Sequence, residues 1–446
     1  MNPGAVKRLE TYFGRIGDVL ELKERRASFA TYAMGILSDA ERKSAEPIAA
    51  RANPDPKGAD AAHQRLLHFV GVSEWSDADV RAEAIRYALP ALVARDKLEA
   101  WIIDDTGFLK QGTHSVGVQR QYTGSAGKVT NCQIGVSLTL ATRSDHVPID
   151  FELYLPKSWT TDRKRRKEAR VPVGVTFATK PELALQMIRR ALDSGLPRGT
   201  VLADAAYGGA KEFRAGLRQL GLDYAVGVNS TTNVRLLDRK GVPNGRPRQL
   251  KTLAHELMLN GAFRRCTWRQ GPRRAMTARF ARVRVRVGDE EQATLLIEWR
   301  NHESEPANYF FVSMGKLPAS NRQLVSIVMQ RWRTERTYQD LKGELGLDHY
   351  EGRSYPGWHH HISVVLACYA FVVAERARRF PPSARGAPPN PQDRLTPGAT
   401  LSRQLHHCPA CGGSHHRDLA SAVSDLPPNQ SAEEASENAQ GEWLTQ

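Results

Sequence analysis

Three acidic residues that are far apart in the sequence have the surroundings that metal-assisted cleavage of a phosphodiester requires. Asp104 follows the apolar run 101–103, and Asp204 follows the apolar run 201–203. Glu335 lies in a basic segment with helical spacing. Cleavage of a phosphodiester needs an activated water and a neutralised leaving oxygen, and two divalent ions about 4 Å apart supply both. Because Mg²⁺ prefers oxygen ligands, the three carboxylates are candidate metal ligands.

The first two carboxylates are predicted to end two strands of one sheet. Residues 211–220, after Asp204, have helical spacing, and 222–228 have the pattern of a further strand, so this stretch is predicted to be a βαβ unit. In an open α/β sheet, ligands bind at the carboxyl ends of the strands. Asp105 follows Asp104 directly, and spacing alone leaves open which of the two binds metal.

The third carboxylate is predicted on a helix from about residue 321 to 345. At roughly 100° per residue, Arg331, Glu335, Tyr338 and Lys342 lie on one narrow face of that helix. A carboxylate flanked by Arg and Lys can bind a metal while its neighbours hold phosphates. The alternative is a solvated helix face with salt-bridge spacing, and the two strand-end carboxylates favour the metal site over it.

These segments resemble the DDE transposases of bacterial insertion sequences, a group of the RNase H-like superfamily whose third motif is Tyr-x2-Arg-x3-Glu-x6-Lys. Arg331, Glu335 and Lys342 fit that spacing, whereas Val328 occupies the tyrosine position and Tyr338 is the expected substitute. In the family's Asp-x-Thr pattern Asp104 comes first, so we favour Asp104 as the ligand and expect Asp105 to support it or to be exposed. The likeness covers about residues 65–375. Further similar stretches are Gly117–Tyr122, Asn131–Gln133, Leu153–Trp159, Gly352–Ser354 and Gly357–His359.

The expected fold class is α/β, with an RNase H-like catalytic core that is interrupted by a β-rich insertion domain and preceded by a helical N-terminal domain. Core strands are predicted near Trp101 and at 129–141, 147–155, 201–204 and 222–228, and alternating strands at 278–287, 293–298 and 309–313. The expected domains are a helical DNA-binding domain (1–95), the first part of the core (96–228), the insertion (229–318), the last part of the core (319–380), and a Pro-rich linker with a disordered tail (381–446).

The resemblance also implies an activity and its partners. Asp104, Asp204 and Glu335 would bind two Mg²⁺, with Mn²⁺ as a substitute, while Arg331 and Lys342 would hold the phosphates beside the cut. The substrate would be double-stranded DNA, cleaved at terminal inverted repeats and then joined through its 3′ ends to target DNA, with a homodimer coordinating the two ends. Two alternatives remain: a catalytically silent, transposase-derived DNA-binding regulator, and a host metal-dependent nuclease of the same fold.

Composition favours a polyanionic partner. The 63 Lys and Arg outnumber the 48 Asp and Glu, which gives a formal net charge of +15. The densest basic cluster is expected to form an exposed loop or helix against DNA. Trp159 before it is a candidate to hold a flipped base, as are Trp268 and Trp299, whereas a tryptophan near strands is more often a core residue. A second basic run, 264–274, is either a DNA contact or a solvated hairpin. The residues of the first cluster are Arg163, Lys164, Arg165, Arg166 and Lys167.

The remaining signals concern metals and location. Cys408 and Cys411 with nearby histidines form half of a Zn²⁺ site, but the loop is short, so we expect an unliganded polar tail and keep zinc as the alternative. Adjacent residues of His359–His361 would point in different directions on a helix, which disfavours a shared metal. Residues 362–374 are apolar but too few to cross a bilayer, so a buried helix and no membrane partner are expected. Five cysteines, an odd number, fit a reducing compartment, here the bacterial cytoplasm at the nucleoid.

Overall fold

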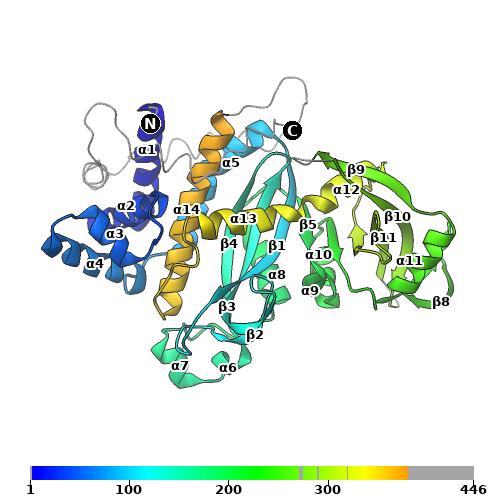
Figure 1. Cartoon of the computed structure of the whole chain (residues 1–446), viewed down its shortest axis with the longest axis horizontal. Coiled ribbons are helices and arrows are strands. Elements are labelled where there is room, and N and C mark those ends of the chain that lie inside the picture. The colour runs from blue at the N-terminus through cyan, green and yellow to red at the C-terminus, as the bar shows by residue number, and fades with distance from the viewer. Residues whose placement is uncertain (1–2, 271–274, 289–290, 319, 380–446) are drawn as a thin grey trace.

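The computed structural model describes residues 3–270, 275–288, 291–318 and 320–379. Cys408, Cys411 and the whole stretch 381–446 therefore lie outside the described residues. The described part is an α/β structure built on one mixed sheet, with helices against both of its faces (Figure 1).

The helices are α1 (Pro3–Leu20), α2 (Lys23–Leu37), α3 (Ala45–Ala52), α4 (Pro56–Gly71), α5 (Asp77–Arg95), α6 (Lys157–Thr160), α7 (Arg163–Glu168), α8 (Lys180–Asp193), α9 (Ala205–Gly208), α10 (Lys211–Gln219), α11 (Leu250–Leu259), α12 (Asn321–Val328), the 3₁₀ turn η1 (Met329–Arg331), α13 (Trp332–Gly343) and α14 (Tyr355–Arg379). The strands are β1 (Leu98–Leu109), β2 (Gln119–Thr123), β3 (Lys128–Thr142), β4 (His146–Tyr154), β5 (Thr200–Ala203), β6 (Tyr224–Gly227), β7 (Asn233–Leu237), β8 (Pro243–Gln249), β9 (Arg264–Gln270), β10 (Ala275–Val287), β11 (Glu291–Arg300) and β12 (Asn308–Ser313).

The N-terminal helices α1, α2, α4 and α5 pack against α14, which runs past them and along the sheet, and α3 packs against α2 and α4 (Figure 1). Tyr12 of α1 is fully buried and donates to the carbonyl of Ala367 at 2.8 Å. α14 is longer than the predicted 362–374. Among the described residues it is the one helix long and apolar enough to cross a membrane, yet its apolar stretch is entirely covered by the rest of the protein. It therefore packs as a core helix.

The core strands form where the sequence predicts them. In the sheet, β3 pairs with β4 and β1 antiparallel, and β1, β5 and β6 run parallel to one another. β2 was not predicted as a strand. Three of its five residues are exposed, so it lacks the apolar alternation that identifies a strand.

The predicted insertion strands correspond to β10, β11 and β12, and they do not form a separate sheet. β12 pairs antiparallel with β6, from Phe310 opposite Gly227 to Ser313 opposite Tyr224. The sheet therefore continues from the core into the insertion in the order β2-β3-β1-β5-β6-β12-β11-β10-β7-β8. Figure 1 shows the insertion strands at the opposite end of the molecule from the N-terminal helices.

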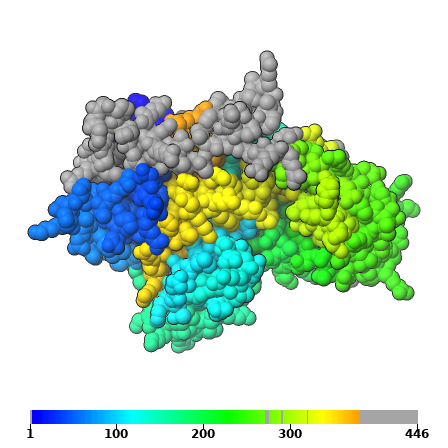
Figure 2. All heavy atoms as spheres, viewed as in Figure 1, coloured from blue at the N-terminus to red at the C-terminus, as the bar shows by residue number. Residues whose placement is uncertain are grey.

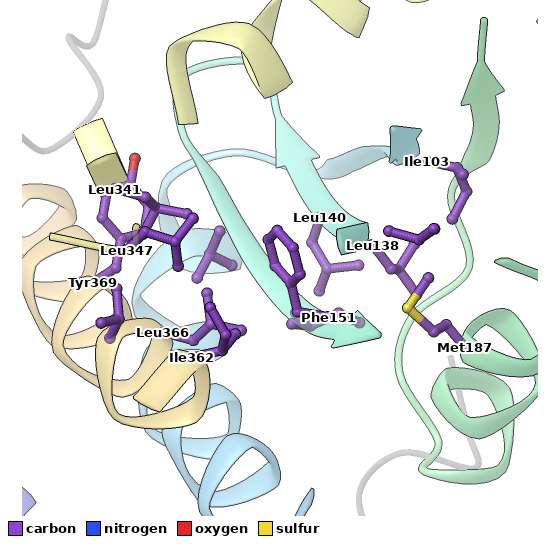
Figure 3. Packing of buried hydrophobic residues seen from close by; sticks show 14 of the residues in the cluster. Ile103, Leu138, Leu140, Phe151, Met187, Leu341, Leu347, Ile362, Leu366 and Tyr369 are labelled. Carbon is purple, nitrogen blue, oxygen red and sulfur yellow. The ribbon is translucent and has the colours of Figure 1, made fainter. Parts of the chain in front are cut away.

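The two faces of the core sheet bury different residues. Ile103 of β1 and Leu138 of β3 gather with Met187 of α8, whereas Ile362 and Leu366 of α14 group elsewhere with Leu341 of α13 (Figure 3). Ala100 and Ile102, the alternate residues of β1, belong to a second apolar cluster with Leu324, Val325 and Val328 of α12. Even-numbered residues of β1 therefore face α12 and α13, and odd-numbered residues face α8.

The single helix predicted over 321–345 was wrong in one respect. The chain forms α12, tightens into the 3₁₀ turn η1 at Met329–Arg331, and continues as α13 to Gly343. A 3₁₀ turn has fewer residues per turn than an α-helix, so angular positions counted across it shift. Arg331 therefore lies before α13, and its direction cannot be read from the same helical wheel as those of Tyr338 and Lys342.

Candidate active site

The sheet brings Asp104 and Asp204 together. The parallel pairing of β1 and β5 runs from Ala100 opposite Thr200 to Ile102 opposite Leu202. Asp104 and Asp204 each lie two residues after this last pair, so the same register places them side by side. Ile102 and Leu202 lie in the same apolar cluster, so the next alternate residues emerge on the same face. Two carboxylates from distant parts of the sequence thus meet where β5 ends. β1 continues past Asp104 to Leu109, so the prediction that Asp104 ends its strand was wrong, because the residues after it still pair with β3.

The pKa of Asp104 is affected by the nearby Asp204. Burial raises the pKa of Asp104 to about 7, with the nearby charge of Asp204 adding to the rise and Arg331 opposing it. The Oδ1 atom of Asp104 accepts the backbone N–H of Asp105 at 2.9 Å, and Oδ2 accepts from Nη1 of Arg331 at 3.1 Å. Two neighbouring, half-buried carboxylates are a donor set that a hard divalent cation fits.

Asp204 is held by the backbone that follows it. It caps α9, with Oδ1 accepting the N–H groups of Ala206 at 2.9 Å and Tyr207 at 3.4 Å. Gly208 packs α9 onto β6, because a Cβ at that position would lie 2.0 Å from the carbonyl oxygen of Gly227. The direction of the Asp204 carboxylate is therefore fixed by a short, tightly packed turn.

Glu335 lies on the same side of the sheet but is more exposed than the half-buried pair Asp104 and Asp204. Its side chain is 66% exposed, and Oε1 lies 3.9 Å from Nη2 of Arg331. The guanidinium of Arg331 thus contacts Asp104 with one nitrogen and approaches Glu335 with the other. Figure 2 shows α13 at the middle of one face of the molecule, between the N-terminal helices and the insertion strands. Among the described residues, no group of three or more His, Cys, Asp or Glu side chains is close enough to form a complete metal site.

The other predicted phosphate contacts on α13 lie against the sheet. Nζ of Lys342 donates to the carbonyl of Gly107 at 2.6 Å and lies 5.2 Å from the ring centre of Phe108. Tyr338 was expected to replace the missing tyrosine of the motif as a phosphate contact. Its hydroxyl instead bonds Ser137 at 2.7 Å, and its ring packs against Phe151. In this conformation Tyr338 fixes α13 to β3, so its hydroxyl is not free for a phosphate.

The basic cluster forms α7, but part of it is used within the protein. Arg163, Lys164 and Lys167 are exposed. Arg165 donates to the carbonyl of Thr113 and stacks on Trp159, 3.8 Å from the ring centre. Arg166 donates to the carbonyl of Pro172 at 2.8 Å.

Trp159, a candidate contact to a base, is a core residue in this conformation. The side chain is 1% exposed, and its indole N–H donates to the carbonyl of Val118 at 2.8 Å. One ring face is covered by Arg165, so Trp159 serves as packing beneath α7.

Two side chains near the site were not identified from the sequence. Lys180 and Tyr207 both bond Oδ2 of Asp105, each at 3.0 Å. Lys180 opens α8, whose start carries the capping box Thr179 and Glu182. That sequence signature of a helix start would have placed a lysine in the first turn, although not its partner.

The chain is similar to known transposases and endonucleases. The chain is 31% identical over 210 residues to a probable transposase for insertion sequence element IS701 from Microchaete diplosiphon, a match covering 47% of this chain and 50% of that protein. The chain thus matches about half the length of this curated relative. A cryo-EM structure of the piggyBac transposase synaptic complex with hairpin DNA has a TM-score of 0.43 and 11% identity over 94% of this chain and 80% of that one.

A family of proteins described as DDE superfamily endonuclease matches residues 16–275. The matched range contains Asp104 and Asp204 and ends before α12. Since it spans more than half of the sequence, the chain belongs to the DDE superfamily of endonucleases.

Proposed function

We propose that this protein is a DNA transposase that cuts the ends of an insertion sequence and joins them to target DNA. The observation that carries the proposal is the register of β1 and β5, which sets Asp104 beside Asp204. The 31% identity to a probable insertion-sequence transposase supports the same reaction. The fold that we propose for residues 96–228 and 319–379 is RNase H-like, which the strand order β4-β3-β1-β5-β6 supports.

Asp104, Asp204 and Glu335 are the residues that would hold Mg²⁺ or Mn²⁺. A bound divalent cation would activate the attacking oxygen and stabilise the leaving oxygen. Asp104 and Asp204 are the half-buried part of this donor set, and a cation would relieve their mutual repulsion. Glu335, which is exposed on α13, would complete the set by a rotation of its side chain or a movement of the helix.

The chain's own cations have roles around the cut. Arg331 would move from Asp104 to a phosphate of the DNA, since its guanidinium lies at the mouth of the site and a planar guanidinium can bind phosphate through two N–H groups. Lys342 would keep its hydrogen bond to the Gly107 carbonyl and contribute positive charge near the bound DNA strand. Arg163, Lys164 and Lys167 of α7 would contact phosphates farther from the cut. We propose a homodimer on DNA, because two transposon ends must be cut together.

The test uses linear DNA that carries the inverted repeats flanking the coding frame. Wild-type protein with Mg²⁺ should cut at a single position at each repeat and produce strand-transfer products with supercoiled DNA, and EDTA should abolish both. Asp104→Asn, Asp204→Asn and Glu335→Gln should each bind the DNA without cutting it. Cutting without end specificity would indicate a metal-dependent nuclease. Specific binding without cutting by the wild type would indicate a regulator.

A further inference from the structure

Asp105 lies on the face of the sheet opposite to Asp104. Alternation along β1 places Asp105 with Trp101 and Ile103, on the side that packs against α8. Its neighbour Asp104 points toward α12 and α13. Asp105 is therefore directed away from the carboxylate pair, although its backbone N–H donates to Oδ1 of Asp104 at 2.9 Å.

The Oδ2 atom of Asp105 receives two bonds from other elements. The hydroxyl of Tyr207 in α9 donates to it at 3.0 Å, and Nζ of Lys180 in α8 lies at the same distance. Tyr207 is fully buried, and burial together with the charge of Asp105 raises the pKa of its phenol well above the usual range. The phenol thus remains a hydrogen-bond donor at any ordinary pH.

Tyr207 is also the residue whose backbone holds Asp204. Its N–H, with that of Ala206, donates to Oδ1 of Asp204. The direct pairing of β1 with β5 ends at Ile102 and Leu202, two residues before the two carboxylates. Beyond that point, the Tyr207–Asp105 bond links the element that carries Asp204 to the strand that carries Asp104.

We propose that Asp105 is a positioning residue that sets the separation of the two carboxylates through Tyr207. The bond joins the residue after Asp104 to the turn after Asp204, so its length limits how far the pair can open. Lys180 offsets the charge of Asp105, so the carboxylate can lie near Asp104 and Asp204 without adding a third unbalanced negative charge. The inference rests on the proposed function in one respect, that Asp104 and Asp204 bind a divalent cation together.

The experiment titrates the full chain with Mn²⁺ and follows free Mn²⁺ by electron paramagnetic resonance, so the readout does not depend on cleavage. Tyr207→Phe removes one oxygen atom and should weaken Mn²⁺ binding about 10- to 100-fold, the usual effect of losing an outer partner of a metal ligand. Asp105→Ala should weaken it similarly. The double variant should bind Mn²⁺ no more weakly than whichever single variant binds it less well, because both changes break the same link. Asp105→Asn, which keeps an acceptor oxygen, should restore part of the affinity.

Tyr224→Phe is the matched control. Tyr224 is also fully buried and donates to a carboxylate, Oε1 of Glu291, at 3.0 Å, but it lies on β6 away from the pair. It should lower thermal stability about as much as Tyr207→Phe and leave Mn²⁺ affinity unchanged. Equal Mn²⁺ affinities in Tyr207→Phe and Tyr224→Phe would overturn the positioning role while leaving the metal assignment intact. Unchanged Mn²⁺ binding in Asp204→Asn would overturn the metal assignment and the positioning role with it.

Discussion

Arg331 donates a hydrogen bond to Asp104 across 3.1 Å, from a 3₁₀ turn to the middle of the sheet. The same guanidinium approaches Glu335 at 3.9 Å. It thus lies between a half-buried carboxylate and an exposed one, and neutralises part of the negative charge of the site. A cation at this place can stabilise the charge that develops on a phosphate during cleavage.

Replacing Arg331 with Met should therefore reduce the single-turnover rate of DNA cleavage about 10²- to 10³-fold, the usual effect of removing one hydrogen-bond donor to the charge that develops during the reaction. Arg331→Lys should recover only part of the loss, because an ammonium lacks the planar pair of donors. Arg322→Met is the control, since Arg322 is exposed on α12 in the same segment. Equal cleavage rates in the Arg331→Met and Arg322→Met variants would exclude a role for Arg331 at the reacting phosphate.

A buried ion pair joins the insertion strands to the core. Arg214 of α10 bonds both carboxylate oxygens of Glu291 in β11, at 2.9 and 2.8 Å, and both side chains are 5% exposed. Arg214→Met should lower the free energy of unfolding by about 3 kcal/mol, because it leaves a buried carboxylate with weaker compensation from Arg218. Chemical denaturation measures this. Arg42→Met, which breaks an exposed pair with Glu351, should cost no more than about 1 kcal/mol.

The effect of Arg214→Met should also depend on pH. Burial alone would raise the pKa of Glu291, but the bonds from Arg214, Arg218 and Tyr224 hold it below its usual value. The pair therefore stabilises the fold above the unfolded-state pKa of about 4.3 and loses that contribution as the pH falls further. The difference between Arg214→Met and wild type should shrink below about pH 4. A constant difference down to pH 3 would mean that the loss of stability has another cause, such as the bond of Arg214 to the Gly208 carbonyl.

His361 should make the fold sensitive to mild acid. It is fully buried in α14, where Nδ1 lies 2.9 Å from the Tyr32 hydroxyl and Nε2 lies 3.1 Å from the Gly346 carbonyl. A neutral ring satisfies both bonds, because Nε2–H donates to the carbonyl and Nδ1 accepts from the hydroxyl. Burial lowers its pKa to about 4. The unfolded chain therefore binds the proton first as the pH falls, so stability is complete above about pH 6.5 and is lost between there and about pH 4.

As the pH falls from 7 to 5, protonation of His361 in the unfolded chain should lower the free energy of unfolding by about 2 kcal/mol. Urea denaturation at the two pH values would measure it. His361→Gln should be less stable at pH 7 but should lose that part of the pH dependence. His114→Gln, at an exposed position, should show the same pH dependence of stability as the wild type. If His361→Gln and wild type lost the same stability between the two pH values, His361 would not be the responsible group.

The sequence predicts the carboxylate pair because each member ends an apolar run, and a parallel sheet brings such ends together. It could not predict that Asp104 and Asp105 divide between the two faces, since that depends on the register of β1 relative to its neighbours. The resemblance favoured Asp104, and the alternation of β1 places Asp104 on the side of Glu335. Its role as a metal ligand stays a prediction.

Tyr338 and Trp159 show where sequence reasoning was insufficient. Both residue types can contact nucleic acid, but a tyrosine or tryptophan also packs well when its polar atom finds a partner. Ser137 and the Val118 carbonyl are those partners, and both come from segments distant in the sequence. The pairing of β12 with β6 was equally beyond local patterns, because strand alternation does not indicate which edge a strand will join.

The continuous sheet has a consequence for DNA binding by the insertion. Phe280 of β10 belongs to the same apolar cluster as Ile102 of β1, so the even-numbered residues of β10 lie on the Asp104 face. Arg282, Arg284 and Arg286 continue that row, and Arg235 of β7 pairs with Arg286. Arg235 and Arg284 are exposed. β10 lies five strands from β1, which at about 4.8 Å per strand is roughly 24 Å, or about seven base pairs of duplex.

The double variant Arg235→Gln with Arg284→Gln should therefore weaken binding of inverted-repeat DNA and lower the slope of log affinity against log salt by about 2, because each cation contributes about one released counterion. Protection of the DNA about seven base pairs from the cut should be lost as well. The matched control is Arg189→Gln with Lys211→Gln, which removes two exposed cations from α8 and α10 on the other face. Equal salt slopes for the two double variants would show that DNA does not cross β10 and β7.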